Sequence, residues 1–281
     1  MKGNKKLLLG VAAILTIGVG VWFLLTRSKS PDMADMDHGA DHSDYMLMLN
    51  TGTKYKVSQP NTLKFMVHDK EGKVVRDFEI MHTKIMHFIV VRKDLANFQH
   101  LHPDFDKESG VFSLPAIKFE TDGEYRLFAD FTPSGGMAQG HEHHAGMAMG
   151  QTLGVSVVAG NESKYRPEPI GDMRTTDRRE NYLFNLENTG SGLERALRFT
   201  ISENGKPAKD LQPYLGALGH IVVLSEGDLL YVHAHPDESA ANAPGAVSFE
   251  VHFPRAGKYK IFGQFQHRGR VLTASFVTEV K

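Results

Sequence analysis

Residues 86–104 read MHFIVVRKDLANFQHLHPD, and residues 219–237 read GHIVVLSEGDLLYVHAHPD. Each stretch holds a short apolar run, a polar turn and a second short segment that ends in His-x-His-Pro-Asp. A short apolar run with β-branched side chains, bounded by turn residues, is typical of a buried strand. The two stretches therefore predict the same β-hairpin at two places in the chain.

The likeness between the two stretches extends along the chain. Residues 63–103 align with residues 196–236 at a constant offset of 133 positions and without a gap, so that Gly72 corresponds to Gly205. Gapless agreement over such a length indicates an internal duplication. We expect each copy to form one domain of the same fold.

The residues of each copy predict strands. Leu63, Phe65 and Val67 alternate with more polar neighbours, and no helix of ten or more residues is predicted after residue 30. About seven short strands in about 100 residues favour an immunoglobulin-like β-sandwich, here without its cysteine pair. The expected fold class is all-β, with two such sandwiches in tandem after an N-terminal transmembrane helix. In chain order we expect a signal anchor (1–29), a Met/His/Asp-rich tether (30–58), the first sandwich (59–158), a linker (159–192) with one short strand at 182–186, and the second sandwich (193–281).

The N-terminal segment predicts attachment to a membrane. Residues 7–25 carry no charge over 19 positions, which is close to the length of a membrane-spanning helix. No small-x-small cleavage site follows the run, so we expect an uncleaved signal anchor. The protein would then be a single-pass protein of the cell membrane, with the bulk of the chain outside the cytoplasm, in the periplasm or extracellular space.

Composition excludes several function classes. The chain has 281 residues, of which 41% are hydrophobic, so disorder is not its main state. Lys plus Arg number 32 against 33 for Asp plus Glu, which leaves no basic excess for binding nucleic acid. There is no cysteine, so thiolate metal sites, disulfides and cysteine nucleophiles are absent. Any metal ion must be held by His, Met, Asp or Glu.

Each copy carries the same histidine pattern: His, twelve residues, His, one residue, His, Pro, Asp. Residues i and i+2 of a strand project from one face about 6.6 Å apart. If residues 87–92 pair with residues 98–102, the first histidine comes close to the other two. Three neutral imidazoles suit Cu²⁺ or Zn²⁺. A structural corner, in which the imidazoles bond to main-chain carbonyls, remains the alternative. The candidate ligands are His87, His100 and His102 in the first copy and His220, His233 and His235 in the second.

Methionine and histidine also gather in two low-complexity segments. Residues 33–48 and 137–149 hold 12 of the chain's 27 Met and His residues, whereas an even spread would place about 3 there. Thioethers select soft Cu(I), so these segments predict copper collection, with a plain acidic linker and a surface loop as the alternative. The candidate ligands are Met33, Met36, His38 and His42 in the first segment and Met137, His141, His143, His144, Met147 and Met149 in the second.

The first copy is expected to be the better copper site. Met81, His82 and Met86 add soft ligands beside its histidines, whereas the second copy has Tyr214, Leu215 and Gly219 at the corresponding positions. Three further histidines stand alone in the sequence and are expected to be surface or hydrogen-bonded strand residues. These are His68, His252 and His267.

At residues 86–91, 100–103 and 263–266 the chain resembles bacterial membrane-anchored secreted proteins of metal handling, whose domains are β-sandwiches of the YtkA and CopC type. The resemblance covers both copies, and its sharpest element is His-x-His-Pro. It implies copper binding outside the cytoplasm. CopC-like proteins can use a mature N-terminal histidine as a ligand, and no such terminus is evident here, so the candidate ligands come from this sequence alone.

Three functions follow as hypotheses. The first is an anchored copper-binding protein for copper buffering, delivery or resistance, with copper as Cu(I) or Cu(II), zinc as the alternative ion, and a copper transporter or cuproprotein as partner. The second is a metal-independent tandem β-sandwich for protein interaction in the cell envelope. The third is a His-liganded metalloenzyme such as a copper oxidase. Neither copy shows an acid–base pair or a nucleophile motif, so we expect no enzyme activity.

Overall fold

The computed structural model describes residues 43–50, 54–134, 150–232, 234–236 and 243–281. These ranges contain no α-helix, and their one helical segment is a short 3₁₀ turn, η2 (Glu162–Lys164). No helix in this part of the chain could cross a membrane, and the expected anchor at residues 7–25 lies outside it. The strands of the described sheets pair antiparallel, and turns and loops join them, in agreement with the all-β prediction.

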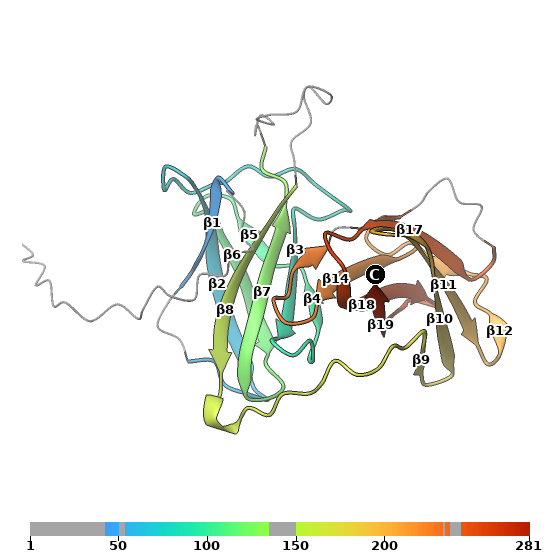
Figure 1. Ribbon diagram of the computed structural model, residues 1–281. Coiled ribbons are helices and arrows are strands. Elements are labelled where there is room, and N and C mark those ends of the chain that lie inside the picture. The colour runs from blue at the N-terminus through green and yellow to red at the C-terminus, as the bar shows by residue number, and fades with distance from the viewer. Residues whose placement is uncertain (1–42, 51–53, 135–149, 233, 237–242) are drawn as a thin grey trace, which may run out of the picture. The chain divides into compact units, whose positions relative to one another are not determined.

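The first sandwich packs two four-stranded sheets face to face (Figure 1). Phe65, Phe88 and Phe112 fill the space between them, with Phe65 stacked on the other two at 4.8 and 5.2 Å between ring centroids. One sheet has the order β1 (Tyr45–Leu49), β2 (Pro60–Asp69), β6 (Val111–Lys118) and β5 (Asp104–Asp106). The other has the order β4 (Gln99–Leu101), β3 (Met86–Arg92), β7 (Gly123–Phe131) and β8 (Gln151–Ala159).

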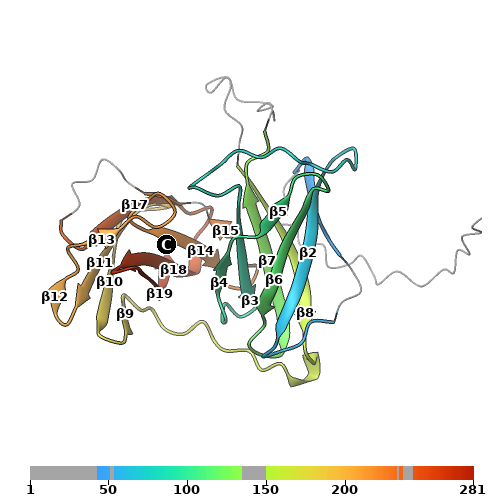
Figure 2. The same cartoon turned by 180° about the vertical axis from the view of Figure 1, so that it is seen from behind.

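The second sandwich repeats this arrangement (Figure 2). Its first sheet has the order β16 (Ala234–Pro236), β17 (Ala246–His252), β11 (Glu194–Glu203), β10 (Tyr182–Ser191) and β9 (Thr176–Arg179), with β12 (Lys206–Pro207) on β11. In its second sheet β18 (Gly257–His267) pairs with β19 (Arg270–Val280) along one side and with β13 (Leu211–Gln212) and β14 (His220–Ser225) along the other, and β15 (Tyr231–Val232) pairs with β14.

The duplication is visible in the strand pairing. The order β4-β3-β7-β8 of the first copy recurs as β15-β14-β18-β19 in the second. Each copy also has a tyrosine near the start of its central strand that donates its hydroxyl hydrogen to a carbonyl four residues upstream, Tyr125 to Thr121 at 2.9 Å and Tyr259 to Arg255 at 2.8 Å. Such a tyrosine corner is typical of immunoglobulin-like sandwiches. The all-β prediction is confirmed, and the antiparallel sheets are consistent with β-sandwiches.

The sandwiches are longer than the sequence indicated. β1 lies in the segment predicted to be a tether, and β9 and β10 lie in the predicted linker. Tyr182, Phe184 and Leu186 are buried in the second core, so the strand expected at 182–186 is a full member of that sandwich. The polar and glycine-rich end of β10 hides the alternation of that strand, and the second sandwich begins near residue 176 instead of residue 193.

β3 is buried on both of its faces. Met86, Phe88 and Val90 face the first core, whereas Ile89 and Val91 belong to a third buried cluster, formed with the second sandwich. This double burial explains why the strand reads as a continuous apolar run without alternation. The third cluster is built from matching positions of the two copies: Ile89, Val91 and Phe128 from the first, and Val222, Leu224 and Phe262 from the second.

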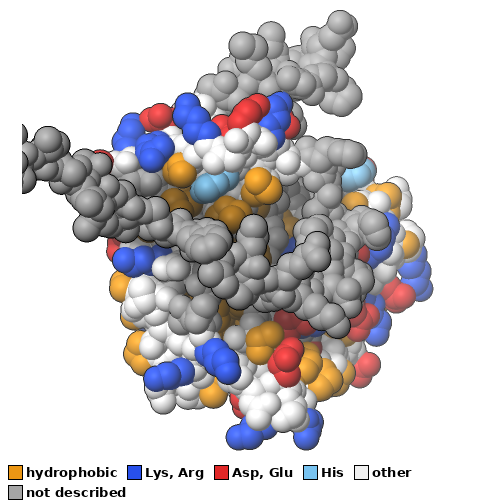
Figure 3. Space-filling view, turned by 90° about the vertical axis from the view of Figure 1, so that its left-hand side faces the viewer, with side chains coloured by type: hydrophobic (Ala, Val, Ile, Leu, Met, Phe, Trp, Pro, Cys, Tyr) orange, Lys and Arg blue, Asp and Glu red, His pale blue; other side chains and the backbone are white. Residues whose placement is uncertain are grey.

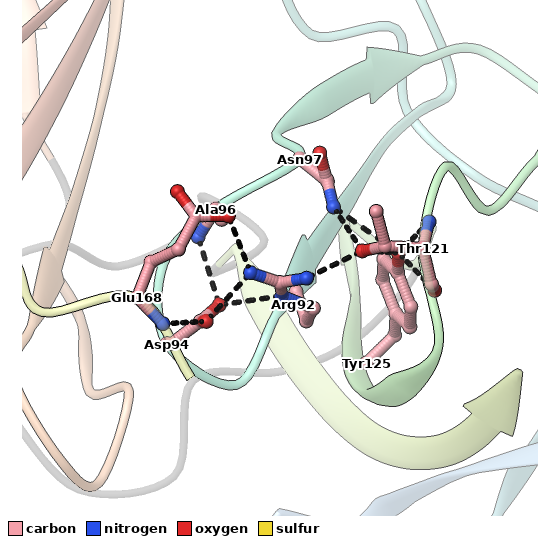
Figure 4. Close-up of polar contacts among 7 residues, drawn as sticks. All are labelled: Arg92, Asp94, Ala96, Asn97, Thr121, Tyr125 and Glu168. Atoms are coloured by element: carbon pink, nitrogen blue, oxygen red, sulfur yellow. Dashed lines mark hydrogen bonds and ion pairs between the residues drawn. The ribbon is translucent and has the colours of Figure 1, made fainter. Parts of the chain in front are cut away.

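Arg92 fastens the turn of the β3–β4 hairpin (Figure 4). Its guanidinium donates to both carboxylate oxygens of Asp94 at 2.8 Å, to Glu168 at 2.7 Å and to the hydroxyl of Thr121. Burial alone would raise the pKa of Asp94, but the bonds from Arg92 and from two backbone N–H groups hold it below its usual range. The same contacts tie the linker between the sandwiches to the hairpin that carries the histidines.

Replacing Arg92 should destabilise this hairpin. In Arg92→Met the carboxylate of Asp94, whose side chain is 6% exposed, loses its charged partner. Removing one member of a buried ion pair costs about 3–5 kcal/mol, which urea denaturation of the full chain would measure. The control is Arg270→Met, whose ion pair with Glu180 is exposed on both sides (55% and 65%), so its loss should cost less than about 1 kcal/mol. Equal costs for the two variants would contradict this role of Arg92.

Candidate metal centre

Three histidines of the first sandwich converge, and we call His87, His100 and His102 the histidine centre. His87 lies in β3 and His100 lies in β4. His102 is the first residue after β4. The two strands pair antiparallel, with Ile89 opposite His100. The hairpin predicted from the sequence is confirmed, and it brings the three imidazoles to the same place.

The nitrogen atoms lie close enough to share one ion. One nitrogen from each histidine lies within 4.8 Å of the other two. His87 Nδ1 is 2.9 Å from His100 Nε2 and 3.3 Å from His102 Nε2. A tetrahedral ion with metal–nitrogen bonds of about 2.0–2.1 Å holds its ligand nitrogens about 3.3 Å apart. The two distances measured from His87 Nδ1 are close to this spacing.

Two hydrogen bonds decide which ring nitrogens carry hydrogen. His87 Nε2 donates to the carbonyl oxygen of Met81 at 3.2 Å, which leaves its Nδ1 with a lone pair. His100 Nδ1 donates to Oε1 of Gln264 at 2.6 Å, which leaves its Nε2 with a lone pair. The amide nitrogen of Gln264 donates to the hydroxyl of Thr273 at 3.2 Å, in agreement with this orientation of the amide.

The histidine centre therefore presents two lone pairs to each other at 2.9 Å. Two acceptors cannot form a hydrogen bond, and a cation between them satisfies both. Metal-bound histidines commonly donate their second N–H to a carbonyl or carboxylate, which fixes the ring. His87 and His100 both make such a contact. The residues present thus fit a transition-metal ion that accepts imidazole, such as copper or zinc.

Burial keeps the three rings neutral. Desolvation, with the neighbouring His100, lowers the pKa of His87 to about 3. Desolvation likewise lowers the pKa of His100 to about 3 and that of His102 to about 4. A proton therefore does not occupy the space between the lone pairs at pH 7. Neutral imidazole is the form that binds a metal ion.

Two further histidines lie beside the centre. The rings of His82 and His220 are 5.1 Å apart between centroids, and each lies about 6 Å from the ring of His87, at 6.1 and 6.2 Å. His220 Nε2 donates to the carbonyl of Leu215 at 3.2 Å. Burial and the nearby His82 lower the pKa of His220. A cavity of about 370 Å³ is lined by His82, His87, His100 and His220, which opens a path to the centre.

The remaining predicted ligands have different places. Met81 contributes its carbonyl oxygen, while its side chain is 46% exposed. Met86 is 1% exposed in the first core, on the opposite face of β3 from His87, so the structure does not bring its thioether to the centre. The side chain of His235 lies outside the described part of the chain. The other candidates also lie outside it: Met33, Met36, His38, His42, Met137, His141, His143, His144, Met147, Met149 and His233.

The Met/His-rich segment at 137–149 joins β7 to β8. Residues on both sides of it that the structure describes, Thr132 and Gly150, line the cavity beside the histidine centre. The chain therefore enters and leaves this segment next to the candidate site.

Sequence reasoning missed Gln264. It comes from β18 of the second copy, and its side chain is 7% exposed among apolar neighbours. The available signal was the position of this amide between Gly263 and Phe265, in a part of β18 that is buried. Its contact with His100 depends on how the two copies pack, which spacing along the chain does not reveal.

Removing the amide of Gln264 should weaken metal binding at the histidine centre. Loss of a hydrogen-bond partner behind a ligand commonly costs about 10–100-fold in metal affinity. We expect this loss for Cu(II) in Gln264→Leu of the full chain, measured by competition with a chelator, and recovery in Gln264→Glu, which keeps an acceptor. Gln266→Leu, two residues further along β18, is the matched control. Unchanged affinity in Gln264→Leu would contradict the role of this contact.

The free energy of unfolding of the metal-free chain should decrease as the pH is lowered from 7 to 5. The histidine centre binds protons only near pH 3–4 when folded, whereas unfolded histidine has a pKa of about 6.5. The unfolded chain therefore takes up more protons below about pH 6.5, and the free energy of unfolding declines by about 1–2 kcal/mol per histidine between pH 7 and pH 5. His100→Gln should reduce this decline, as urea denaturation at the two pH values would show. An equal decline in both proteins would contradict the assignment.

Solved structures share little with the chain beyond β-structure. A DUF4426 family protein from Pseudomonas aeruginosa is 10% identical, with 38% of this chain and 96% of that chain covered and a TM-score of 0.28. Invasin, a bacterial integrin-binding protein, is 13% identical over 83% of this chain and 38% of its own, with a TM-score of 0.21. Trypsin-activated alpha-2-macroglobulin from Escherichia coli is 13% identical over 87% of this chain and 16% of its own, with a TM-score of 0.23. These low scores carry no argument about function.

No curated protein matches the chain. The model of one protein family, described as a domain of unknown function (DUF8832), matches residues 40–144 and residues 176–281. The first matched range covers β1 to β7 of the first sandwich, and the second covers β9 to β19 of the second sandwich. The chain belongs to the DUF8832 family.

Proposed function

We propose that this chain is a membrane-anchored, extracytoplasmic copper-binding protein that holds copper at the histidine centre for buffering, delivery or resistance. The observation that carries the proposal is the pair of imidazole lone pairs that face each other at 2.9 Å, each fixed by a second hydrogen bond. Such an arrangement favours a cation between the two nitrogens, and burial disfavours a proton there.

Copper is favoured over zinc by two features of the chain. Imidazole sites generally bind Cu²⁺ more tightly than Zn²⁺. The thioether-rich segments at 33–48 and 137–149 suit Cu(I), and the second of them is joined to the rim of the cavity. Zinc remains the second candidate ion, because three imidazoles also suit it.

The proposed location rests on the apolar segment at residues 7–25. A signal anchor there would hold both sandwiches outside the cytoplasm, where a copper transporter or a cuproprotein would exchange the ion. The chain would bind and transfer copper without turning over a substrate. A nucleic-acid partner is disfavoured by the charge balance of −1.

A metal-independent role in protein interaction is the second candidate. It is favoured by the contacts of His87 and His220 with main-chain carbonyls, which a purely structural histidine corner would also make. In that case the histidines stabilise the hairpins, and the sandwiches serve as a rigid envelope module.

Titration of the full chain separates the two functions. We expect wild type to retain Cu(II) against a competing chelator and His100→Ala/His102→Ala to lose more than about 100-fold in affinity, because two of three ligands are gone. His252→Ala removes a surface histidine, 65% exposed at its side chain, and should leave the affinity unchanged. Failure of wild type to retain either Cu(I) or Cu(II) would leave the interaction role. Retention by the double variant would assign binding to the Met/His-rich segments instead.

A further inference from the structure

The outer face of β1 and β2 carries a second set of soft ligands. The two strands pair antiparallel, with Met46 opposite His68 and Met48 opposite Met66. Side chains of directly paired residues lie on the same face of a sheet, with Cβ atoms about 4.5–5.5 Å apart. Three thioethers and one imidazole therefore meet on one surface, which we call the methionine face.

The methionine face points away from the first core. On β1, Leu47 and its alternate neighbours pack against the core, and on β2 the residues Phe65 and Val67 are fully buried. Met46 and Met48, which alternate with them, are 49% and 45% exposed. Figure 3 looks onto the side of the molecule where β1 lies in Figure 1 and shows a histidine side chain beside hydrophobic side chains.

His68 is the polar member of the methionine face. It lies between Met46 of β1 and Val74, with which it forms an isolated bridge, so its ring is partly buried. Its Nε2 is shielded from solvent and has no hydrogen-bond partner within the described residues. A buried polar atom without a partner is unfavourable, and a ligand at this nitrogen would satisfy it.

The donor set decides which ion suits the methionine face. Thioether sulfur is a soft ligand that selects Cu(I), and imidazole accepts Cu(I) as well. None of the four side chains carries a negative charge, and the carboxylate of Asp44, next to β1, pairs with Lys70 at 3.4 Å. A neutral set of this kind compensates a monovalent soft ion better than a divalent one.

We propose that Met46, Met48, Met66 and His68 form a Cu(I) site on the outer face of the first sandwich, separate from the histidine centre. Met46 and Met48 belong both to β1 and to the Met/His-rich segment at 33–48, so the site would share two of its ligands with that segment. It holds the ion as Cu(I) without a change of oxidation state.

The test follows the methionine methyl groups directly. The full chain, with its 12 methionines labelled with ¹³C at the methyl group, is titrated with Ag(I), a redox-inert ion of the same charge and ligand preference as Cu(I). Resonances are assigned by single Met→Leu substitutions. We expect the signals of Met46, Met48 and Met66 to shift together at one equivalent, and to do so equally in His100→Ala/His102→Ala. Independence from the histidine centre makes failure here distinguishable from failure of the proposed function.

Matched variants test the ligand set. Met48→Leu/Met66→Leu keeps the apolar volume but removes two sulfurs, and His68→Leu removes the imidazole. Each should weaken Ag(I) binding at the remaining signals at least about tenfold. Met173→Leu, at a methionine that is 61% exposed elsewhere, should have no effect. The proposal is overturned if the three signals stay fixed while other methionines shift, or if neither variant weakens binding.

Discussion

The burial of β3 on both faces is the constraint on which the rest of the structure depends. One face closes the first core, and the other packs against the second copy through Ile89 and Val91. The strand cannot shift by one residue without exchanging these two faces, so its register is fixed. His87 lies near the start of this strand, and Arg92 at the other end fixes the turn that returns the chain to His100.

The same constraint shapes the chemistry of the histidine centre. Because the second copy packs against β3, Gln264 reaches His100 and sets the ring nitrogen that carries hydrogen. The centre is thus built by the first copy and completed by the second. The matching contacts between copies, with Phe98 on Phe262 at 4.1 Å and Phe128 near Tyr231 at 5.5 Å, show that the duplicated surfaces meet each other. The copies nevertheless differ around this contact, since His82 occurs only in the first.

Local pattern predicted the histidine centre more fully than it predicted the domain limits. The spacing of His87, His100 and His102 was sufficient to predict that the three imidazoles converge. Residues i and i+2 lie on one face of a strand, and a hairpin brings residues close in sequence next to each other. β1 was assigned to a connecting segment because it lies in a stretch rich in Met, His and Asp, and β10 because its end carries asparagine and glycine, which are depleted in strands. His68 had no neighbour in sequence that suggested a ligand, and only the pairing of β1 with β2 places Met46 opposite it.

The sequence by itself determined an all-β chain, its duplication and the three histidines of each copy, because strand periodicity and spacing are local properties. Tertiary structure alone decided that Gln264 lies behind His100, that Met86 is buried in the core, and that three methionines share a surface with His68. These are contacts between strands distant in the chain. These contacts form because the chain packs together the sheet faces that bury the most apolar surface. A short stretch of sequence does not determine which faces pack together.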